Sequence, residues 1–340
     1  MAFKIRIEPS GHEYHADAGE TVLESALRHG FNLPYSCRNG ACATCKGRVL
    51  GGRVDHGEFE ARALSDAERA AGFALFCRAR PLADLLIEVQ EVGVAQGIAV
   101  KTLPCRVARM ERLAPDVMAL HLKLPQTERL QFLAGQYLDI LLRDGRRRSF
   151  SLANAPHDDA LLTLHVRHVP GGHFSDQVFT RMQEKDLLRF RGPLGSFFLR
   201  EESPRPLLFM AGGTGFAPIK SIIEHVFYIG LDRPMHLYWG ARAVVDLYRH
   251  ALAGSWVAHQ PVFRYTPVLS EPRADEPWDG RRGWVHAALL ADHPDLSGYD
   301  VYASGPPAMI EAAKPAFAAA GLPEAQFFYD SFEYARDPPA

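Results

Sequence analysis

The stretch Cys37-Arg38-Asn39-Gly40-Ala41-Cys42-Ala43-Thr44-Cys45 places three cysteines on one short loop, and a fourth cysteine, Cys77, follows after 31 further residues. The spacing Cys-x4-Cys-x2-Cys followed by a distant cysteine is that of the plant-type ligands of a [2Fe–2S] cluster. Thiolate sulfur is a soft, anionic ligand that suits iron. We therefore expect Cys37, Cys42, Cys45 and Cys77 to be metal ligands in an electron carrier.

The small residues of this loop agree with that prediction. Gly40, Ala41 and Ala43 let backbone N–H groups turn toward the sulfurs, and such hydrogen bonds tune the potential of a cluster. The two alternatives are a zinc site and disulfides. Zinc ligands usually come as two close pairs, and the chain offers no second pair. Disulfides need an oxidising compartment.

The bulk composition narrows the function further. The chain has 340 residues, enough for two or three domains, with 47% hydrophobic and 23% charged residues and a formal net charge of -2. A nucleic-acid partner would favour a basic face, so none is expected. No apolar run is long enough to span a membrane. The sequence begins directly with a strand pattern and not with a signal peptide, so we expect a soluble protein of the cytoplasm.

The first block, residues 1–93, alternates apolar and polar residues at Phe3, Ile5 and Ile7, which predicts a strand. A helix is expected over Val22 to Leu27, and the capping box at residues 65–68 predicts a second, short helix. Alternation at residues 85–89 predicts a closing strand. This pattern is typical of a small β-grasp domain, and residues 94–101 are expected to form a linker. The fifth cysteine, Cys105, is expected to be a buried free thiol.

Two further blocks follow. Residues 102–203 contain several alternating segments and the hairpin signal Asp144-Gly145, which together predict a small antiparallel barrel. In residues 204–340 the period of the apolar residues changes. The pattern predicts a short apolar strand at Leu207 to Met210, a glycine-rich turn, a helix that ends at Gly230 and another strand. The order strand–helix–strand predicts a parallel sheet of the nucleotide-binding type.

Two motifs in the second block suit a flavin nucleotide. An arginine fork holds a pyrophosphate, an aromatic ring stacks on a flat heterocycle and a hydroxyl bonds its edge. The motif residues are Arg148, Ser149, Phe150 and Ser151. In the second motif, Gly171-Gly172 precedes Ser175, which is predicted to cap a helix whose N-terminus favours an anion. Each motif alone also fits an ordinary barrel strand or a plain hairpin turn.

Two motifs in the third block suit a second dinucleotide. Gly212-Gly213-Thr214-Gly215 joins a buried strand to a helix, and Pro218 fits the first helical turn. It lacks the Gly-x-Gly-x-x-Gly spacing, so the alternative is a glycine-rich connection without a ligand. A second run, Ser304-Gly305-Pro306-Pro307-Ala308-Met309, also follows a predicted strand and precedes a helix. Both runs are expected beyond the carboxyl ends of parallel strands.

In this order the motifs make the whole chain resemble the ferredoxin–NADP⁺ reductase superfamily, in the branch with an N-terminal [2Fe–2S] ferredoxin domain. That branch includes CDP-6-deoxy-3,4-glucoseen reductases, which the segment from Gly192 to Phe197 resembles most. It also includes reductase components of aromatic-ring, phenol, toluene and methane oxygenases. The resemblance implies electron flow from NAD(P)H to FAD, to the [2Fe–2S] cluster and on to a partner protein.

The resemblance also implies residue roles. Arg148 matches the position on the FAD pyrophosphate and Phe150 the position against the flavin ring. The remaining matches are Ser149, Ser151, His165, Val166, Gly171, Gly172 and Ser175 for FAD, and Gly212, Gly213, Thr214, Gly215, Pro218, Gly305 and Pro306 for NAD(P). Ser304 stands where the family usually has a cysteine near the nicotinamide, so we expect altered hydride transfer. One aromatic ring between Phe327 and Phe332 is expected over the flavin, or alternatively in a core strand.

The sequence favours one of the two nicotinamide cofactors and does not identify the electron acceptor. An NADP site would need clustered positive charge, but Arg242 and Arg249 are opposed by Asp246, so NADH is expected and NADPH remains an alternative. The ferredoxin block has 11 basic and 13 acidic residues, so charge does not identify the partner. A deoxysugar dehydrase and an oxygenase component both remain open. A non-catalytic electron-transfer scaffold with a decayed nicotinamide site is the alternative of another class.

Overall fold

Alternating apolar residues build a five-stranded mixed sheet in the N-terminal part of the chain. The computed structural model describes residues 2–92, 98–273 and 277–333, which fall into two compact units, residues 1–99 with 333–340 and residues 100–332. In the first unit Ile5 and Ile7 are fully buried, and the strand that carries them pairs in parallel with the strand Leu85–Glu88. The sheet order is β2 (Glu13–Ala16), β1 (Phe3–Glu8), β7 (Leu85–Glu88), β3 (Lys46–Gly51) and β5 (Phe73–Leu75), with a separate pair β4 (Val54–Asp55) and β6 (Arg80–Pro81).

Two short helices complete this unit. Helix α1 (Val22–Arg28) begins at a capping box, because the Thr21 hydroxyl accepts from the N–H of Glu24 while the Glu24 carboxylate accepts from the N–H of Thr21. Helix α2 (Asp66–Ala70) begins at the predicted box of Ser65 and Glu68. The parallel pair around one packed helix confirms the β-grasp prediction.

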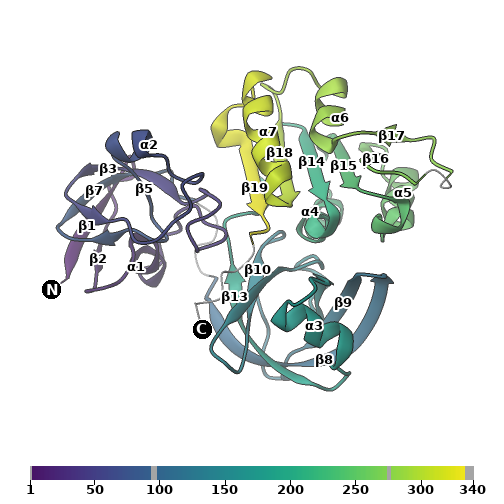
Figure 1. Ribbon diagram of the computed structural model, residues 1–340, viewed down its shortest axis with the longest axis horizontal. Helices are drawn as coiled ribbons and strands as arrows, with labels where there is room; N and C mark the ends of the chain where they lie inside the picture. Colours follow the sequence, from purple (N-terminus) through teal and green to yellow (C-terminus); the bar gives the residue numbers. More distant parts are fainter. Residues whose placement is uncertain (1, 93–97, 274–276, 334–340) are drawn as a thin grey trace. The chain divides into compact units, whose positions relative to one another are not determined.

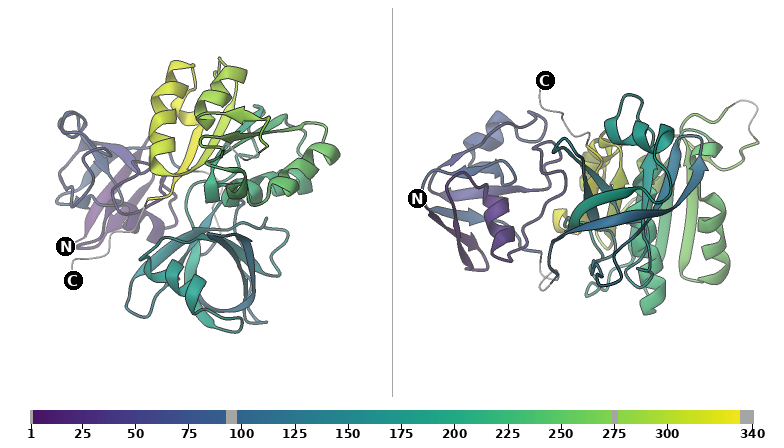
Figure 2. Two further views of the ribbon diagram at one scale, coloured as in Figure 1. Left: turned by 45° about the vertical axis from the view of Figure 1, so that its right-hand side comes forward. Right: turned by 90° about the horizontal axis from the view of Figure 1, so that it is seen from below.

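The second unit begins with an antiparallel barrel. Its strands, in sheet order, are β11 (Arg147–Ser151), β10 (Tyr137–Leu141), β13 (Leu187–Leu194), β8 (Lys101–Ala114), β9 (Val117–Lys123) and β12 (Leu162–Arg167). A bridge between Leu152 and Leu164 joins the two edges and closes the sheet, and the curvature is visible in Figure 2. Helix α3 (His173–Thr180) packs on β12. Lys101 already belongs to β8, and residues 94–97 of the predicted linker lie outside the described residues.

A six-stranded sheet, parallel throughout, follows the barrel. Its order is β17 (Arg281–Arg282), β16 (Phe263–Leu269), β15 (Met235–Ala241), β14 (Leu207–Gly212), β18 (Asp300–Gly305) and β19 (Phe327–Ser331). The connecting helices are α4 (Phe216–Ile229), α5 (His250–His259), α6 (Val285–Asp292) and α7 (Pro307–Ala319), with single 3₁₀ turns η1 (Gly213–Gly215), η2 (Val244–Asp246) and η3 (Glu324–Gln326).

Alternation along the central strands divides the apolar side chains between two cores. Leu207 and Phe209 face a core shared with α4 and α5, whereas Leu208 and Met210 face a core shared with α6 and α7. The helices therefore cover both faces of the sheet (Figure 1). Because all strands point the same way, the ends of β14, β15 and β18 meet at one edge. This confirms the predicted parallel nucleotide-binding sheet.

Loop and helix contacts hold the barrel against the parallel sheet inside the second unit. The Ser221 hydroxyl on α4 donates to the backbone oxygen of Asn154 at 2.8 Å, and both residues are buried. The Lys220 ammonium donates to the backbone oxygen of Ala153 at 3.1 Å. Within the described part of the chain, no helix is long and apolar enough to cross a membrane. The exact domain boundaries predicted at residues 93, 101 and 203 remain predictions.

Candidate functional site

The four predicted ligand cysteines come together as two pairs. Cys37, Cys42 and Cys45 lie on the loop between α1 and β3, and Cys77 follows β5. A hydrogen bond from the Cys42 thiol lowers the pKa of Cys37 to about 7, and the backbone N–H groups of Asn39 and Ala41 add to this effect. Cys77 is paired with Cys45 in the same way, so its pKa is also lowered. Backbone N–H groups therefore do turn toward the sulfurs.

Two pairs of thiols fit a two-iron group. Each iron of such a cluster takes two protein thiolates. In the described residues no group of three or more histidine, cysteine or acidic side chains surrounds a single point. The donor set is all sulfur, and three of the four cysteines are buried.

The predicted flavin motif lies on β11, next to the closing edge of the barrel. The half-buried ring of Phe150 packs 5.2 Å from the ring of Phe174, and the exposed Ser149 donates to the carboxylate of Asp139 at 2.7 Å. The hydroxyl of Ser151 donates to the carboxylate of Asp330 on β19 at 3.3 Å. Of the motif, Ser151 therefore contacts the parallel sheet, whereas Phe150 packs against the barrel core.

The structure brings the other predicted flavin residues to the same edge. Because the bridge of Leu152 to Leu164 joins β11 to β12, His165 and Val166 are neighbours of the motif. Val166 points into the barrel core, whereas His165 points out of it and its Nδ1 lies 3.0 Å from the Tyr248 hydroxyl. Burial holds the pKa of His165 well below its ordinary value, so this imidazole is neutral at pH 7.

One detail of the glycine motif differs from the prediction. Ser175 does not cap the helix: α3 begins at His173 after Gly172, and Ser175 lies in its first turn. Its hydroxyl instead accepts from the N–H of Val169 at 3.1 Å and donates to the backbone oxygen of the same residue at 3.0 Å. The serine thus fixes the turn that precedes the helix, because its side chain reaches back past the glycines.

The two predicted nucleotide turns lie against each other. A Cβ atom on Gly215 would stand only 1.9 Å from the backbone oxygen of Ser304, so no other residue fits there. A Cβ on Gly305 would be 2.9 Å from the backbone oxygen of Gly212. Pro218 is the third residue of α4 and therefore lies in its first turn, as predicted. Gly305 itself ends β18, and α7 begins at Pro307.

Ser304 lies beneath this junction. The residue is fully buried, and among the described residues its hydroxyl has no hydrogen-bond partner. The aromatic rings of β19 pack inside the domain: the Phe328 ring stacks on Tyr302 at 4.7 Å, and the Phe327 ring meets Phe317 edge-on at 5.5 Å. These contacts fit the core-strand alternative for this segment.

Two residues of the site were not identified from the sequence. The guanidinium of Arg167, at the end of β12, lies so close to Gly213 that a Cβ there would stand 3.0 Å from its Nη1. Arg167 is also 3.4 Å from the carboxylate of Asp116. Asp330 is the second, through its bond from Ser151. Arg167 follows the inward-pointing Val166 on a strand with clear alternation, so the sequence could predict that Arg167 points outward. The sequence could not predict that Gly213 lies beside it.

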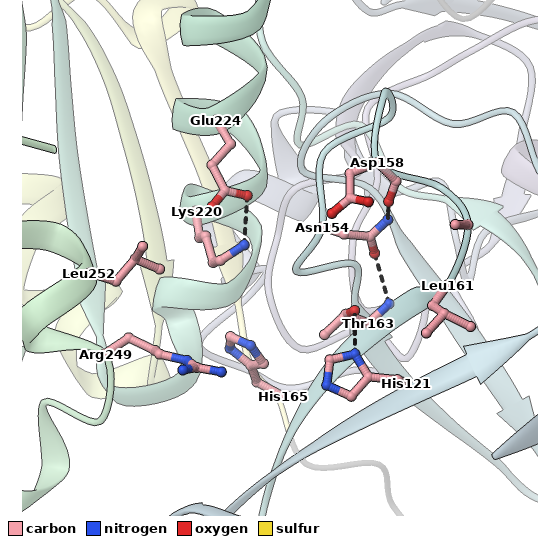
Figure 3. Close-up of a pocket in the computed structure, with 11 residues that line it drawn as sticks. His121, Asn154, Asp158, Leu161, Thr163, His165, Lys220, Glu224, Arg249 and Leu252 are labelled. Atoms are coloured by element: carbon pink, nitrogen blue, oxygen red, sulfur yellow. Dashed lines mark hydrogen bonds and ion pairs between the residues drawn. The ribbon is translucent and has the colours of Figure 1, made fainter. Parts of the chain in front are cut away.

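A cavity of about 370 Å³ lies between the barrel and α4 and α5 (Figure 3). Its polar lining includes His121 and Thr163 from the barrel strands and Lys220 and Arg249 from the helices. The cations are already paired, because Lys220 donates to Glu224 at 2.6 Å and Arg249 to Glu111 at 2.9 Å. Only His165 of the predicted ligand residues lines this cavity, so it is separate from both glycine turns.

The fold and the site together define an electron-transfer reductase with three modules. Family models match each of them: a 2Fe-2S iron-sulfur cluster binding domain at residues 5–82, an oxidoreductase FAD-binding domain at 104–199 and an oxidoreductase NAD-binding domain at 209–315. The chain belongs to the ferredoxin–NADP⁺ reductase superfamily, in the branch with an N-terminal [2Fe–2S] ferredoxin domain. It is an NAD(P)H-dependent oxidoreductase.

Similar proteins span nearly the whole chain. The CDP-6-deoxy-L-threo-D-glycero-4-hexulose-3-dehydrase reductase of Yersinia pestis is 40% identical over 98% of this chain and 99% of its own. The reductase component of phenol 2-monooxygenase from Pseudomonas sp. strain CF600 is 37% identical over 99% of this chain and 96% of its own. The crystal structure of the Amycolatopsis cytochrome P450 reductase GcoB aligns with a TM-score of 0.81 at 35% identity, covering 97% of this chain and 98% of that one.

Proposed function

We propose that this protein takes electrons from NADH and delivers them to a dehydrase that acts on a CDP-linked deoxysugar. The observation that carries the proposal is the 40% identity with a reductase of that kind along nearly the full length of both chains. When bound, FAD accepts an electron pair from a nicotinamide and releases single electrons, which a [2Fe–2S] cluster carries one at a time. In this proposal the chain's own residues hold and orient these groups.

We propose the following roles for residues of the second unit. Arg148, on the barrel edge, is proposed to hold the flavin pyrophosphate, with Phe150 against the ring and Ser151 at its edge. The turn from Gly212 to Gly215 is proposed to hold the nicotinamide dinucleotide, because the N-terminus of a helix such as α4 favours an anion. Ser304 is proposed to lie near the nicotinamide. The contact between Ser151 and Asp330 supports a meeting of both sites at one junction.

NADH is proposed as the donor because the arginines near the ribose end are engaged. Arg249 donates to Glu111 of the barrel at 2.9 Å, which directs it away from a 2′-phosphate. The carboxylate of Asp246 accepts from the N–H of Ala243 at 3.3 Å and lies 3.6 Å from Arg242. A fixed carboxylate at this place favours a ribose hydroxyl and repels a phosphate.

We also place the protein in the cytoplasm. None of the five cysteines forms a disulfide, and Cys105, buried in the barrel, has its pKa raised to about 12 by that burial. Cysteines without disulfides are typical of a reducing compartment. Fractionation of the source cells with an antibody against the chain tests this placement: recovery from the periplasm or the membrane fraction would contradict it.

The acceptor is tested by anaerobic re-oxidation. The protein is reduced with one equivalent of dithionite and mixed with the CDP-6-deoxy-L-threo-D-glycero-4-hexulose-3-dehydrase of Yersinia pestis, and the return of the visible absorbance is timed. We expect re-oxidation with the dehydrase and its sugar substrate to be at least tenfold faster than with the oxygenase component of phenol 2-monooxygenase. The reverse order would overturn the dehydrase assignment.

The second candidate is an oxygenase reductase. It is favoured by the 37% identity with the phenol 2-monooxygenase component and by the fold likeness to a P450 reductase. Faster re-oxidation by the phenol hydroxylase, with coupled product formation from phenol, would establish it. Both outcomes leave the reductase class unchanged.

A further inference from the structure

A buried tryptophan supports the dinucleotide turn from below. Trp239 lies on β15, and no part of it is exposed. Its indole Nε1–H donates to the backbone oxygen of Gly213 at 3.1 Å. Its ring stacks on Phe216, the first residue of α4, with centroids 3.9 Å apart and planes inclined by 8°. One side chain therefore contacts both ends of the turn.

The hydrogen bond sets the direction of a peptide group. In a trans peptide the carbonyl of one residue and the N–H of the next point in opposite directions. Because the Gly213 oxygen is drawn toward Trp239, inside the domain, the N–H of Thr214 points the other way. Gly213 has a φ of +53°, a left-handed conformation that leaves a glycine peptide free to turn over unless it is held.

A turned peptide would harm phosphate binding. Reversal of the Gly213 carbonyl would remove an N–H donor from the ligand side of the turn and present a carbonyl oxygen to an anion instead. The Phe216 N–H also donates to the Gly213 oxygen, but this bond lies within the 3₁₀ turn and moves with it. Trp239 is the partner outside the turn, because it is anchored in the parallel sheet.

The same tryptophan is linked to the flavin barrel. The ring of Tyr248 meets Trp239 edge-on, with centroids 5.2 Å apart and planes inclined by 86°. The Tyr248 hydroxyl lies 3.0 Å from Nδ1 of His165 on β12. A continuous chain of contacts thus runs from the glycine turn to the barrel strand that carries predicted flavin residues.

We propose that Trp239 is a positioning residue for the nicotinamide dinucleotide: its indole N–H holds the Gly213 carbonyl inward, so that the backbone N–H groups of the turn face the pyrophosphate. The inference rests on the proposed binding of NADH at the turn. It predicts that loss of the indole N–H weakens dinucleotide binding and leaves the chemical step at saturation unchanged.

The test compares two tryptophans of one aromatic cluster. Trp239→Phe keeps an aromatic ring beside Phe216 and removes the donor. Trp256→Phe is the matched control, because Trp256 also packs near Phe216, at 6.0 Å, and among the described residues makes no hydrogen bond to the turn. We expect the Kd for NAD⁺, measured by calorimetry on the flavin-loaded protein, and the KM for NADH to rise about tenfold in Trp239→Phe only. The limiting rate of flavin reduction should stay within about twofold.

A second variant removes the donor without leaving a cavity. Incorporation of 3-benzothienylalanine at position 239 replaces the indole N–H by sulfur and keeps the bicyclic shape. The same rise in the Kd for NAD⁺ is expected. An unchanged Kd in this variant, or equal effects in Trp239→Phe and Trp256→Phe, would overturn the inference. If the unaltered protein neither binds NAD⁺ nor is reduced by NADH, the proposed function fails instead.

Discussion

Ser304 stands where the resemblance to the superfamily leads us to expect a cysteine. It occupies the position of the usual cysteine at the end of β18, is fully buried, and has a hydroxyl without a partner among the described residues. A buried, unpaired hydroxyl costs about 1–3 kcal/mol. A residue kept at such a cost is expected to contribute when the nicotinamide is bound.

The substitution Ser304→Cys tests that role. We expect the first-order rate of flavin reduction by NADH, followed by stopped-flow absorbance, to change by more than about threefold, because sulfur is larger and bonds more weakly than oxygen. The variant should also be about 1 kcal/mol more stable, since a thiol is less costly to bury unpaired than a hydroxyl. Ser304→Ala, which should gain similar stability, separates the loss of the hydroxyl from the effect of the sulfur on the rate. An unchanged reduction rate in Ser304→Cys would show that residue 304 takes no part in hydride transfer.

The chemistry of single residues is what the sequence predicted best. The four cysteines were identified from spacing alone, because a cluster restricts its ligands to a few loop lengths. Arg167 and Asp330 were missed because their neighbours come from other elements, Gly213 and Ser151, which lie far away in the sequence. The predicted capping role of Ser175 was wrong, because the helix begins at His173, three residues before the start that a cap at Ser175 would give.

Among the elements, β15 and the end of α6 meet in a network of polar rings, of which His236 and His293 are half-buried. Nδ1 of His236 on β15 lies 3.2 Å from Nε2 of His293, and its Nε2 lies 2.8 Å from the Thr266 hydroxyl. Burial, followed by the charge of His293, lowers the pKa of His236 to about 4. The Tyr238 hydroxyl, on the same strand, donates to Asp292 at 2.8 Å.

This network makes stability depend on pH. An unfolded histidine binds a proton below about pH 6.5, whereas folded His236 does so only near pH 4, so between these values the unfolded chain holds more protons. Lowering the pH through this window therefore destabilises the folded protein, by about 2 kcal/mol after allowance for solvent screening. In urea titrations, His236→Gln should lose less stability than the unaltered protein between pH 6.5 and pH 4.5. Parallel stability curves would contradict the assignment.

Most helices and strands were predictable where apolar residues recur at a regular helical or strand spacing. The helix over α4, its glycine end at Gly230 and the capping box at Ser65 follow from local chemistry. Element ends were less predictable. The sequence indicated a turn at Ser304 and Gly305, but β18 continues through both, because Ser304 pairs with Ala211 and Asp330 in the sheet. Pairing across strands decides such ends, and a single sequence does not show it.

At the scale of the whole molecule, the chain combines three modules. Together they connect a donor that gives two electrons at once to a cluster that carries one electron at a time. The order of the modules was predictable, because each has its own period and motif. The way the barrel meets the parallel sheet was not, since it depends on contacts such as Ser221 with Asn154 and Tyr248 with His165. These contacts fix how the barrel lies against the parallel sheet inside the second unit.

The most direct test is an anaerobic titration of the purified protein with NADH, recorded by visible absorbance and electron paramagnetic resonance. We predict that the flavin and cluster absorbance bleaches promptly and that the signal of a reduced [2Fe–2S] cluster appears. Reduction by NADPH alone would reverse the proposed donor and keep the electron path. With FAD and iron present, an absence of bleaching by either nucleotide would contradict the reductase account and favour a scaffold with a decayed nicotinamide site.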